Sequence, residues 1–365
     1  MKQDKVLITG GAGFIGSNLA NRLISQGHQV TIFDNLSRPG CETNLTWLRQ
    51  SHGPDAFHCI QANVTDYPAL LNAAEGVDRI YHLAGQVAVT TSVQNPRLDL
   101  EQNVFGTFNA LEAARLVANN PIFIYASTNK VYGGMENVAV VEDECRYSYS
   151  NLPLGISEEQ PLDFHSPYGC SKGTGDQYTR DYARIYGLRS VVMRQSCIYG
   201  YRQFGMEDQG WVAWFVIAAL KQRPITIYGN GKQVRDILFV EDLLDAYDAA
   251  VFNIDRAAGQ IYNVGGGPNN TMSVWEDFGP ILEILIGKQI PVQYSDWRPG
   301  DQPIYVSDIR KAQQELGWSP KVGVQEGITR LYNWVRDNQD LFSNLYMNGK
   351  SSIQGIISLK DNLTV

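Results

Sequence analysis

Tyr168 and Lys172 stand four positions apart in the segment SPYGCSKG. Side chains at this spacing share one face of an α-helix and can reach one ligand. A tyrosine that acts as a base must lose its proton near neutral pH, although the pKa of a free tyrosine is about 10. A neighbouring ammonium group stabilises the phenolate, so the pair predicts a tyrosine that serves as general base. Taken alone, the same spacing also fits an ordinary surface contact between Tyr and Lys.

Thr128 closes the apolar run IFIYAST and is the third residue of this candidate centre. At the end of a strand its hydroxyl can hydrogen-bond the hydroxyl group that reacts on a substrate. A β-branched residue in this place is otherwise an ordinary strand residue. The three residues together predict proton transfer to and from an alcohol.

A glycine-rich turn near the N-terminus gives a second chemical signal. Gly10, Gly13 and Gly16 have G-x-x-G-x-x-G spacing between an apolar run and a helical pattern that begins at about Phe14. Glycine allows the tight turn and the close approach of the backbone to a pyrophosphate, whose charge then lies at the helix N-terminus. The turn predicts a dinucleotide cofactor, and it makes the catalytic interpretation of Tyr168 the better one.

Asp34 follows about twenty residues later, at the end of the second apolar run. Its carboxylate is placed to accept hydrogen bonds from the adenosine ribose and would repel a 2′-phosphate, which favours NAD over NADP. Arg38 could accommodate the extra phosphate and leaves NADP as the weaker alternative. Further positions belong to the same site if the strands are parallel, because ligands collect at their C-terminal ends; these positions are Asn63, Val64, Leu83, Ala84, Gly85 and Asn103.

The elements that must position these residues alternate between short apolar runs and helical patterns. This βαβ rhythm predicts an α/β fold, a Rossmann-type doubly wound parallel sheet with helices on both faces. One long helix is expected after Ser92, and an irregular, functional loop is expected from 133 to 164. Beyond Gln195 the segments become rich in Trp, Gly and Pro, with one return to the sheet at GQIYNVGG.

The sequence thus predicts a smaller, interleaved C-terminal substrate domain. The expected division is 1–195 for the NAD-binding domain, with about 236–265 returning to it, 196–235 and 266–338 for the substrate domain, and 339–365 for a tail.

Bulk composition restricts the class of partner. The formal net charge is −8 and no Lys/Arg-rich stripe is present, so we expect no nucleic acid. The longest apolar stretch, from Trp211 to Leu220, is too short to span a bilayer, and we expect a cytoplasmic protein without a membrane partner. The five cysteines are scattered and show no C-x-x-C spacing, which argues against disulfides and against a metal site.

Longer segments resemble the extended short-chain dehydrogenases that act on nucleotide sugars. These segments are TGGAGFIG, HLAG, the Ser-Thr pair at the strand end, Tyr-x-x-x-Lys, RQSCIYGYRQ, GNGKQVRDILFVEDL and RPGDQPIYVSDIRKAQQELGWSPK. The resemblance runs from about residue 5 to about residue 338. More narrowly, ASTNKVYG, LDFHSPYGCSKG, DQYTRDYARIYGL and QFGMEDQGWVAWF look like the CDP-paratose 2-epimerases, also called CDP-tyvelose epimerases.

The resemblance implies a role for each matching position. Thr128, Tyr168 and Lys172 are implied to be catalytic, and Arg235 and Arg298 to hold the diphosphate. The implied NAD contacts are Gly10, Gly13, Phe14, Ile15, Gly16, Asp34, Asn35, Ser37, Asn63, Val64, Leu83, Ala84, Gln86, Asn103, Tyr168 and Lys172. The implied substrate contacts are Gln86, Ser92, Thr128, Cys197, Asp208, Gln209, Trp211, Tyr228, Arg235, Arg298 and Asp301.

Two positions depart from the wider family. Nucleotide-sugar 4,6-dehydratases carry Asp-Glu after the strand-end threonine, because eliminating water requires a general acid and a general base. This chain has Asn129-Lys130 there, which disfavours a dehydratase. Cys197 stands where many members have an Asn that contacts the nucleotide or its phosphate, and the tyvelose branch also lacks that Asn.

The resemblance implies redox-neutral epimerisation of a nucleotide sugar, at C2 of CDP-paratose to give CDP-tyvelose, by transient hydride transfer to NAD and return to the opposite face. A UDP-hexose 4-epimerase would use the same residues at another carbon. An alternative of another class is a non-catalytic NAD-sensing protein of the same fold. We expect a homo-oligomer.

Overall fold

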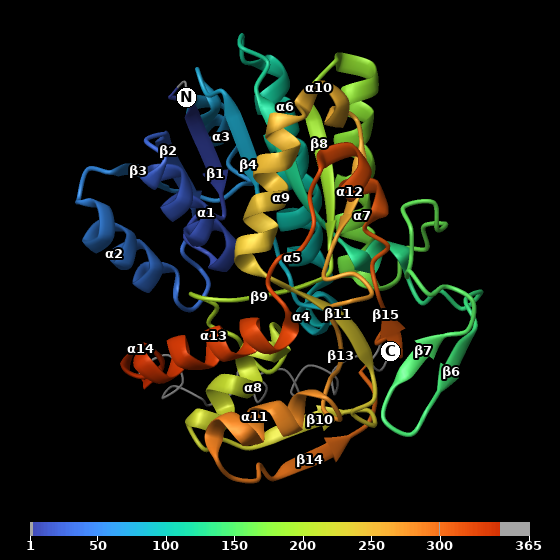
Figure 1. The fold of residues 1–365 in the computed structure, drawn as a ribbon. Coiled ribbons are helices and arrows are strands. Elements are labelled where there is room, and N and C mark those ends of the chain that lie inside the picture. The colour runs from blue at the N-terminus through green and yellow to red at the C-terminus, as the bar shows by residue number, and fades with distance from the viewer. Residues whose placement is uncertain (1–2, 299, 344–365) are drawn as a thin grey trace, which may run out of the picture.

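The structure is a computed structural model that describes residues 3–298 and 300–343. Its centre is a parallel sheet of seven strands in the order β12-β8-β5-β4-β1-β2-β3 (Figure 1). The strands are β1 (Lys5–Thr9), β2 (Gln29–Asp34), β3 (Phe57–Gln61), β4 (Arg79–His82), β5 (Ile122–Thr128), β8 (Ser190–Gln195) and β12 (Ile261–Val264). β1 pairs with β2 on one side and β4 on the other, so the strand order reverses there, where parallel sheets bind their ligands.

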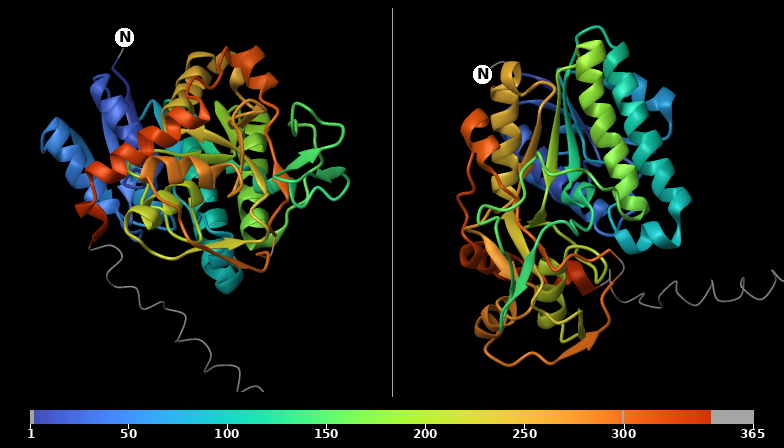
Figure 2. Two further views of the ribbon diagram at one scale, coloured as in Figure 1. Left: turned by 60° about the horizontal axis from the view of Figure 1, so that its bottom comes forward. Right: turned by 90° about the vertical axis from the view of Figure 1, so that its right-hand side faces the viewer.

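Helices cover both faces of this sheet, which explains why its strands are nearly continuous apolar runs. The right-hand view of Figure 2 shows the sheet between the two helical layers. One layer contains α1 (Phe14–Ser25), α2 (Cys41–His52), α9 (Val240–Phe252) and α12 (Arg310–Leu316). The other contains α3 (Tyr67–Ala74), α6 (Gly106–Leu116) and α7 (Ser166–Tyr186). The predicted Rossmann-type fold is confirmed.

The long helix expected after Ser92 runs without interruption from Pro96 to Leu116, and a short helix precedes it. The segment consists of α4 (Val89–Gln94), α5 (Pro96–Leu100), a π-helical turn η1 (Glu101–Phe105) and α6. The break comes at Asn95, whose side chain accepts a hydrogen bond from the backbone N–H of Leu98 at 3.1 Å and so caps α5. Pro96 then occupies the first helical position, where its missing N–H costs nothing.

The polar stretch from 133 to 164 contains a short hairpin. A 3₁₀ turn η2 (Asn129–Tyr132) precedes it, and the strands β6 (Val140–Glu142) and β7 (Tyr147–Tyr149) pair antiparallel and project at the right of Figure 1. The stretch is therefore only partly irregular.

A smaller part lies beyond the C-terminal ends of the large sheet, in the lower half of Figure 1. It contains two small sheets, one of β9 (Cys197–Tyr199), β11 (Val234–Phe239), β13 (Thr271–Ser273) and β15 (Ile304–Tyr305), and one of β10 (Ile225–Tyr228) and β14 (Val292–Ser295). Its helices are α8 (Trp211–Leu220), α11 (Phe278–Ile286), α13 (Val324–Asp337) and α14 (Asp340–Ser343), and they enclose a core of their own.

The chain passes between the two parts repeatedly. The return predicted at 236–265 contains α9, the short α10 (Ile254–Ala257) and β12, but its first residues belong to β11 in the smaller part. α12, which the expected division places in 266–338, packs against β12 and α9. Of the predicted tail, residues 344–365 lie outside the described residues.

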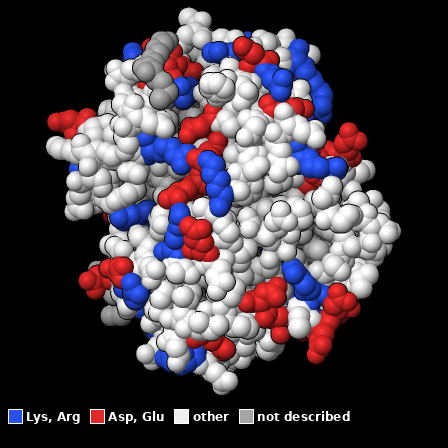
Figure 3. Space-filling view, viewed as in Figure 1, with Lys and Arg blue, Asp and Glu red and all other residues white. Residues whose placement is uncertain are grey.

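The charged side chains are mixed in sign. On the face shown in Figure 3, acidic and basic residues lie next to one another over most of the surface. Within residues 3–298 and 300–343 we find no helix with the length and hydropathy of a membrane span, and no group of three side chains that could hold a metal ion.

Candidate active site

The glycine turn between β1 and α1 is shaped for close approach. Gly10 has a φ of +70°, and a Cβ on it would lie 2.7 Å from the backbone nitrogen of Ala84 at the end of β4. Gly13 is the N-cap residue of α1, and no side chain caps the N–H groups of the first turn. These N–H groups are the natural partners of a phosphate. The turn therefore fits the pyrophosphate of NAD.

Asp34 is buried at the end of β2, only 8% exposed. Its Oδ2 accepts a hydrogen bond from the backbone N–H of Ala12 at 3.0 Å, and its Oδ1 accepts one from Leu36 at 2.8 Å. Burial raises the pKa of this carboxyl, and the two backbone bonds oppose that rise. Each carboxylate oxygen has a second lone pair, so Asp34 can fix the glycine turn and still accept from a ribose.

The amide residues predicted around the cofactor have partners within the protein. Oδ1 of Asn63 accepts from the backbone N–H and the hydroxyl of Thr65, both at 3.0 Å. Oδ1 of Asn103 accepts from the backbone N–H of Gln86 at 2.8 Å, and the Gln86 side chain bonds to Ala88. These residues shape the loops after β3 and β4, and their direct contact with NAD stays a prediction, as it does for Asn35, whose Oδ1 accepts from Ser37.

Thr128, Tyr168 and Lys172 meet where β5 ends and α7 begins, and all three are buried. Burial raises the pKa of Tyr168 to about 12, while a hydrogen bond with the Thr128 side chain lowers it. Burial lowers the pKa of Lys172 to about 8, and its Nζ lies 4.3 Å from the ring centroid of Tyr125. The predicted constellation is assembled, with Tyr168 and Thr128 in direct contact.

The sequence predicts that the ammonium of Lys172 lowers the pKa of Tyr168. In the structure the cation that does so is Arg38, whose guanidinium also donates to Gln209 on the substrate side. The pKa of Arg38 is itself lowered by burial. Arg38 thus links the loop after β2 to the substrate segment, a role that its position in the sequence did not reveal.

Asp99 is a buried acid that the sequence reasoning missed. It is 1% exposed and accepts a hydrogen bond from Nδ2 of Asn103 at 3.1 Å. Burial raises its pKa, whereas Ser171, Lys172 and Asn103 lower it. Its negative charge in turn favours the protonated form of Lys172. The available signal was its place four residues before Asn103, on the same face of the helical segment.

Ser92 holds the start of α7. Its hydroxyl oxygen accepts from the backbone N–H of Tyr168 at 3.2 Å, and the hydroxyl donates to the carbonyl of Val89. The side chain is fully buried. Its contact with substrate stays a prediction, and in the structure it fixes the backbone of Tyr168.

Three predicted substrate residues gather on one side of the smaller part. The guanidinium carbon of Arg298 lies 3.8 Å from the ring centroid of Tyr228, and Nη2 of Arg298 forms an ion pair with Asp208 at 3.2 Å. The hydroxyl of Tyr228 donates to the carboxylate of Glu207 at 2.9 Å, so Glu207 fixes the aromatic ring. An arginine held flat in this way presents its remaining donors as a planar fork.

Cys197, another predicted substrate residue, lies near Arg235 on β11. Burial raises the pKa of the Cys197 thiol to about 12, and Arg235 and the indole of Trp211 oppose that rise. Lys130, on η2, belongs to the same group. Burial lowers its pKa to about 8, with Arg235 acting in the same sense and Asp301 in the opposite one. The sequence reasoning used Lys130 only as a sign of missing dehydratase acids.

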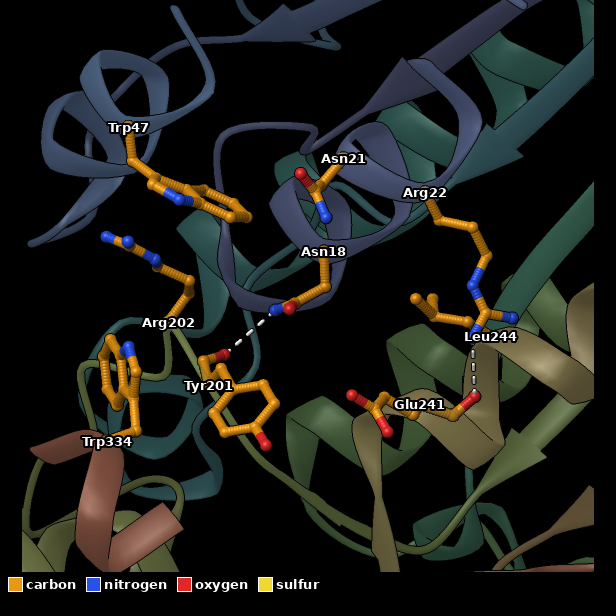
Figure 4. A pocket seen from close by; sticks show the side chains of 9 residues that line it. All are labelled: Asn18, Asn21, Arg22, Trp47, Tyr201, Arg202, Glu241, Leu244 and Trp334. Atoms are coloured by element: carbon orange, nitrogen blue, oxygen red, sulfur yellow. Dashed lines mark hydrogen bonds between the residues drawn. The ribbon is translucent and has the colours of Figure 1, made fainter. Parts of the chain in front are cut away.

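A separate cavity of about 440 Å³ lies on the outer side of α1, and no predicted site residue lines it (Figure 4). The guanidinium carbon of Arg202 lies 4.1 Å from the ring centroid of Trp47 and 5.6 Å from that of Trp334. Burial lowers the pKa of Arg202 to about 10. Because Trp47 belongs to α2 and Trp334 to α13, this stack connects the two parts of the molecule.

Residues 7–331 match the family model described as GDP-mannose 4,6 dehydratase. The chain belongs to this family of extended short-chain dehydrogenases. It is 46% identical to the CDP-paratose 2-epimerase of Salmonella typhi over 336 residues, which are 91% of this chain and 99% of that protein.

Solved structures resemble the whole described fold. A dTDP-glucose 4,6-dehydratase of Streptomyces venezuelae with NAD bound has a TM-score of 0.80 and 28% identity, and the alignment covers 94% of this chain and 100% of the other. A UDP-glucose 4-epimerase of Thermotoga maritima with UDP-glucose has a TM-score of 0.78 and 29% identity, covering 92% of this chain and 99% of the other. The protein is an NAD-dependent enzyme of the nucleotide-sugar epimerase and dehydratase group.

Proposed function

We propose that this enzyme is a CDP-paratose 2-epimerase, which interconverts CDP-paratose and CDP-tyvelose. The observation that carries the proposal is the sequence after Thr128, where Asn129 and Lys130 occupy the turn η2 in place of an acid pair. Water elimination has no acid–base pair in that turn, whereas epimerisation requires none. The 46% identity to a CDP-paratose 2-epimerase over nearly the whole of both chains supports the same choice.

In the proposed reaction the chain's own groups hold and move one proton. The Thr128 hydroxyl orients the C2 hydroxyl of the sugar. Tyr168 removes the proton of that hydroxyl while the covalent bond between C2 and its hydrogen breaks. NAD supplies the acceptor and then the donor of one hydride. The 2-keto sugar turns in the site before the hydride returns to its other face, and Tyr168 gives the proton back to the oxygen. Lys172 is proposed to reach the nicotinamide ribose, and the charge of Arg38 to favour the phenolate of Tyr168.

The second candidate is a UDP-hexose 4-epimerase. The chain is 33% identical to a putative UDP-glucose 4-epimerase of Methanocaldococcus jannaschii over 91% of its length. The same three catalytic residues would serve at C4. The two candidates differ in the nucleotide base and in the carbon that loses its hydrogen.

Isotopic labelling separates the two candidates. We expect a CDP-sugar deuterated at C2 to react with a primary isotope effect and to keep its deuterium on C2, while a C4-deuterated sugar shows no such effect. Products from CDP-, UDP- and GDP-sugars are identified by NMR. An isotope effect from C4 would favour the 4-epimerase, and loss of the label to water would contradict the hydride mechanism altogether.

The redox balance gives an independent check. A neutral cycle regenerates NAD, so the purified enzyme should complete many turnovers without net consumption of NAD. Absorbance at the wavelength of reduced nicotinamide measures this directly. Accumulation of NADH in step with product would refute an epimerase.

We also propose that the chain forms a homo-oligomer through α6 and α7. Large apolar side chains are exposed along this layer, and the rings of Phe108 and Tyr178 contact each other with centroids 6.2 Å apart. Ile185 near the end of α7 is 65% exposed. Apolar surface of this kind is typical of a subunit interface. Sedimentation analysis of Phe108→Asp against the unaltered chain tests the proposal.

A further inference from the structure

Lys130 connects the end of β5 to Gly300, a residue between two predicted substrate contacts. It follows Thr128 by two residues, and its Nζ donates a hydrogen bond to the carbonyl of Gly300 at 3.0 Å. Gly300 stands between Arg298 and Asp301, two of the predicted substrate contacts. The bond therefore holds Gly300 close to the turn that follows β5, where Tyr168 and Thr128 meet.

The Lys130 ammonium has more N–H donors than acceptors around it. A protonated lysine has three N–H donors, and among residues 3–298 and 300–343 only Gly300 accepts a hydrogen bond from it. Asp301 is the carboxylate whose charge acts on it, yet no ion pair joins the two. Arg235 adds a second positive charge beside it. A partly buried cation costs free energy unless an anion or further acceptors satisfy it.

Arg235, the second cation, also has N–H donors without an acceptor among residues 3–298 and 300–343. Nη1 of Arg235 donates to the carbonyl of Val234 at 2.8 Å, which anchors one nitrogen of the guanidinium to its own strand. The planar fork of an arginine and the point charge of a lysine together suit the oxygens of a diphosphate. A neutral sugar hydroxyl would relieve neither positive charge.

We propose that Lys130, held by its hydrogen bond to Gly300, binds the diphosphate of the nucleotide sugar beside Arg235. The proposal rests on the proposed function only in taking a nucleoside diphosphate as the ligand. It gives the turn that follows Thr128 a binding role in this chain, where dehydratases carry their acid and base.

The first test measures binding rather than turnover. With the full chain loaded with NAD, calorimetry at pH 7.5 compares CDP, UDP and cytidine, which has no phosphate. Lys130→Met should weaken binding of the preferred diphosphate on the order of 10- to 100-fold, the usual weight of one charge-assisted hydrogen bond, and leave cytidine unchanged.

Lys311→Met is the matched control. Lys311 lies on α12, which packs against β12 and α9, and its Nζ donates to Oε1 of Gln260 at 3.0 Å. This variant should bind CDP as the unaltered chain does. Thermal unfolding of both variants shows that each is folded before its binding is measured.

The second test uses pH. Burial holds the pKa of the free Lys130 ammonium near 8, so it is charged below that pH and loses its charge above it. A bound diphosphate favours the charged form, so diphosphate affinity should fall up to tenfold per pH unit above about 8. In Lys130→Arg the charge persists, and the affinity should stay level from pH 7 to 9.5.

The comparison isolates Lys130 because its charged surroundings stay in place. Arg235 and Asp301 face it, and the ring of His165 lies beside Gly300. All three residues are present in the unaltered chain and in Lys130→Arg, and the ligand itself titrates in the same way with both. A difference between the two pH profiles therefore comes from residue 130.

Three outcomes would overturn the proposal. They are unchanged diphosphate binding in Lys130→Met, an equal loss of cytidine binding, and parallel pH profiles for the unaltered chain and Lys130→Arg. If only UDP binds tightly and Lys130→Met weakens it, the phosphate role stands while the CDP-paratose assignment fails. If Lys130→Met loses turnover but binds the diphosphate normally, Lys130 acts on the sugar and the assignment of function survives.

Discussion

On the cofactor side, Gly10 and Asp34 are held by backbone contacts at the ends of buried strands. On the substrate side, Arg298 and Asp208 extend from loops, and the Asp208 side chain is 50% exposed. Relatives with the same fold act on different sugars, glucose in one and glucuronic acid in another, and the solved structures of both hold NAD. The difference teaches that the predicted cofactor contacts are fixed within the sheet, whereas the predicted sugar contacts are side chains on loops, which can change without disturbing the sheet.

Two ion pairs show the same contrast in energetic terms. Arg194 on β8 and Asp176 on α7 form a pair at 2.9 Å whose side chains are 2% and 0% exposed, and Arg194 also donates to the hydroxyl of Tyr132. The pair between Arg298 and Asp208 stands partly in water. The first fixes α7 against the sheet, and the second orients Arg298, a predicted substrate contact.

The largest effect on turnover is expected at Tyr168, which lies between the cofactor side and the substrate side. Tyr168→Phe removes the proposed base but keeps the ring, so turnover should fall by a factor on the order of 10² to 10⁴ while NAD affinity changes little. Steady-state rates and NAD titration measure the two quantities. Tyr178→Phe on the exposed face of the same helix is the control. Near-normal turnover in Tyr168→Phe would show that the base lies elsewhere.

Breaking the buried pair between Arg194 and Asp176 tests how much it contributes to stability. Arg194→Met leaves the carboxylate of Asp176 buried with only Ser127 and Gln177 as neutral donors, so the free energy of unfolding should fall by about 3–5 kcal/mol. Urea unfolding measures it. A loss below about 1 kcal/mol would mean that the pair is no more important than one on the surface.

The preference for NAD over NADP should depend on a single residue on the cofactor side. Asp34→Ala removes a carboxylate that pairs with the ribose and repels a 2′-phosphate, so the ratio of NAD to NADP affinity should fall roughly 10- to 100-fold. Fluorescence titration with both cofactors gives the ratio. If it does not change, Arg38 is the next residue to substitute, because it lies in the same loop.

The smallest effect on stability is expected on the substrate side. Arg298→Met breaks an exposed pair and should lower the free energy of unfolding by no more than about 1 kcal/mol. Its binding of nucleoside diphosphate should nevertheless weaken clearly, because the arginine is proposed to hold phosphate. A large loss of stability with normal binding would reverse the contrast between the two sides.

Features with a fixed spacing could be predicted from the sequence. Gly10, Gly13 and Gly16 act through backbone shape, and Tyr168 and Lys172 share a face of α7, so periodicity alone places them. The break between Asn95 and Pro96 was also readable, since an Asn before a Pro caps a new helix.

Contacts made by long side chains across the fold could not be predicted in this way. Arg38 reaches Gln209, which is 171 positions away, and Lys130 reaches Gly300, which is 170 positions away. Such pairs depend on how the loops are arranged after the sheet has formed, and no local spacing encodes them. Asp99 is intermediate, because its helix face was readable but its burial beside Lys172 was not.

The position of β12 has a consequence for synthesis of the chain. β8 pairs with β5 on one side and with β12 on the other, and all six of its residues are buried. While the chain emerges from the ribosome, β8 is complete some 70 residues before Val264 follows, a delay of several seconds at 5–20 residues per second. During that time an apolar strand edge is exposed and can pair with another chain. A nascent chain released before β12 is made is therefore expected to aggregate, whereas a chain that includes α9, β12 and α12 covers this edge.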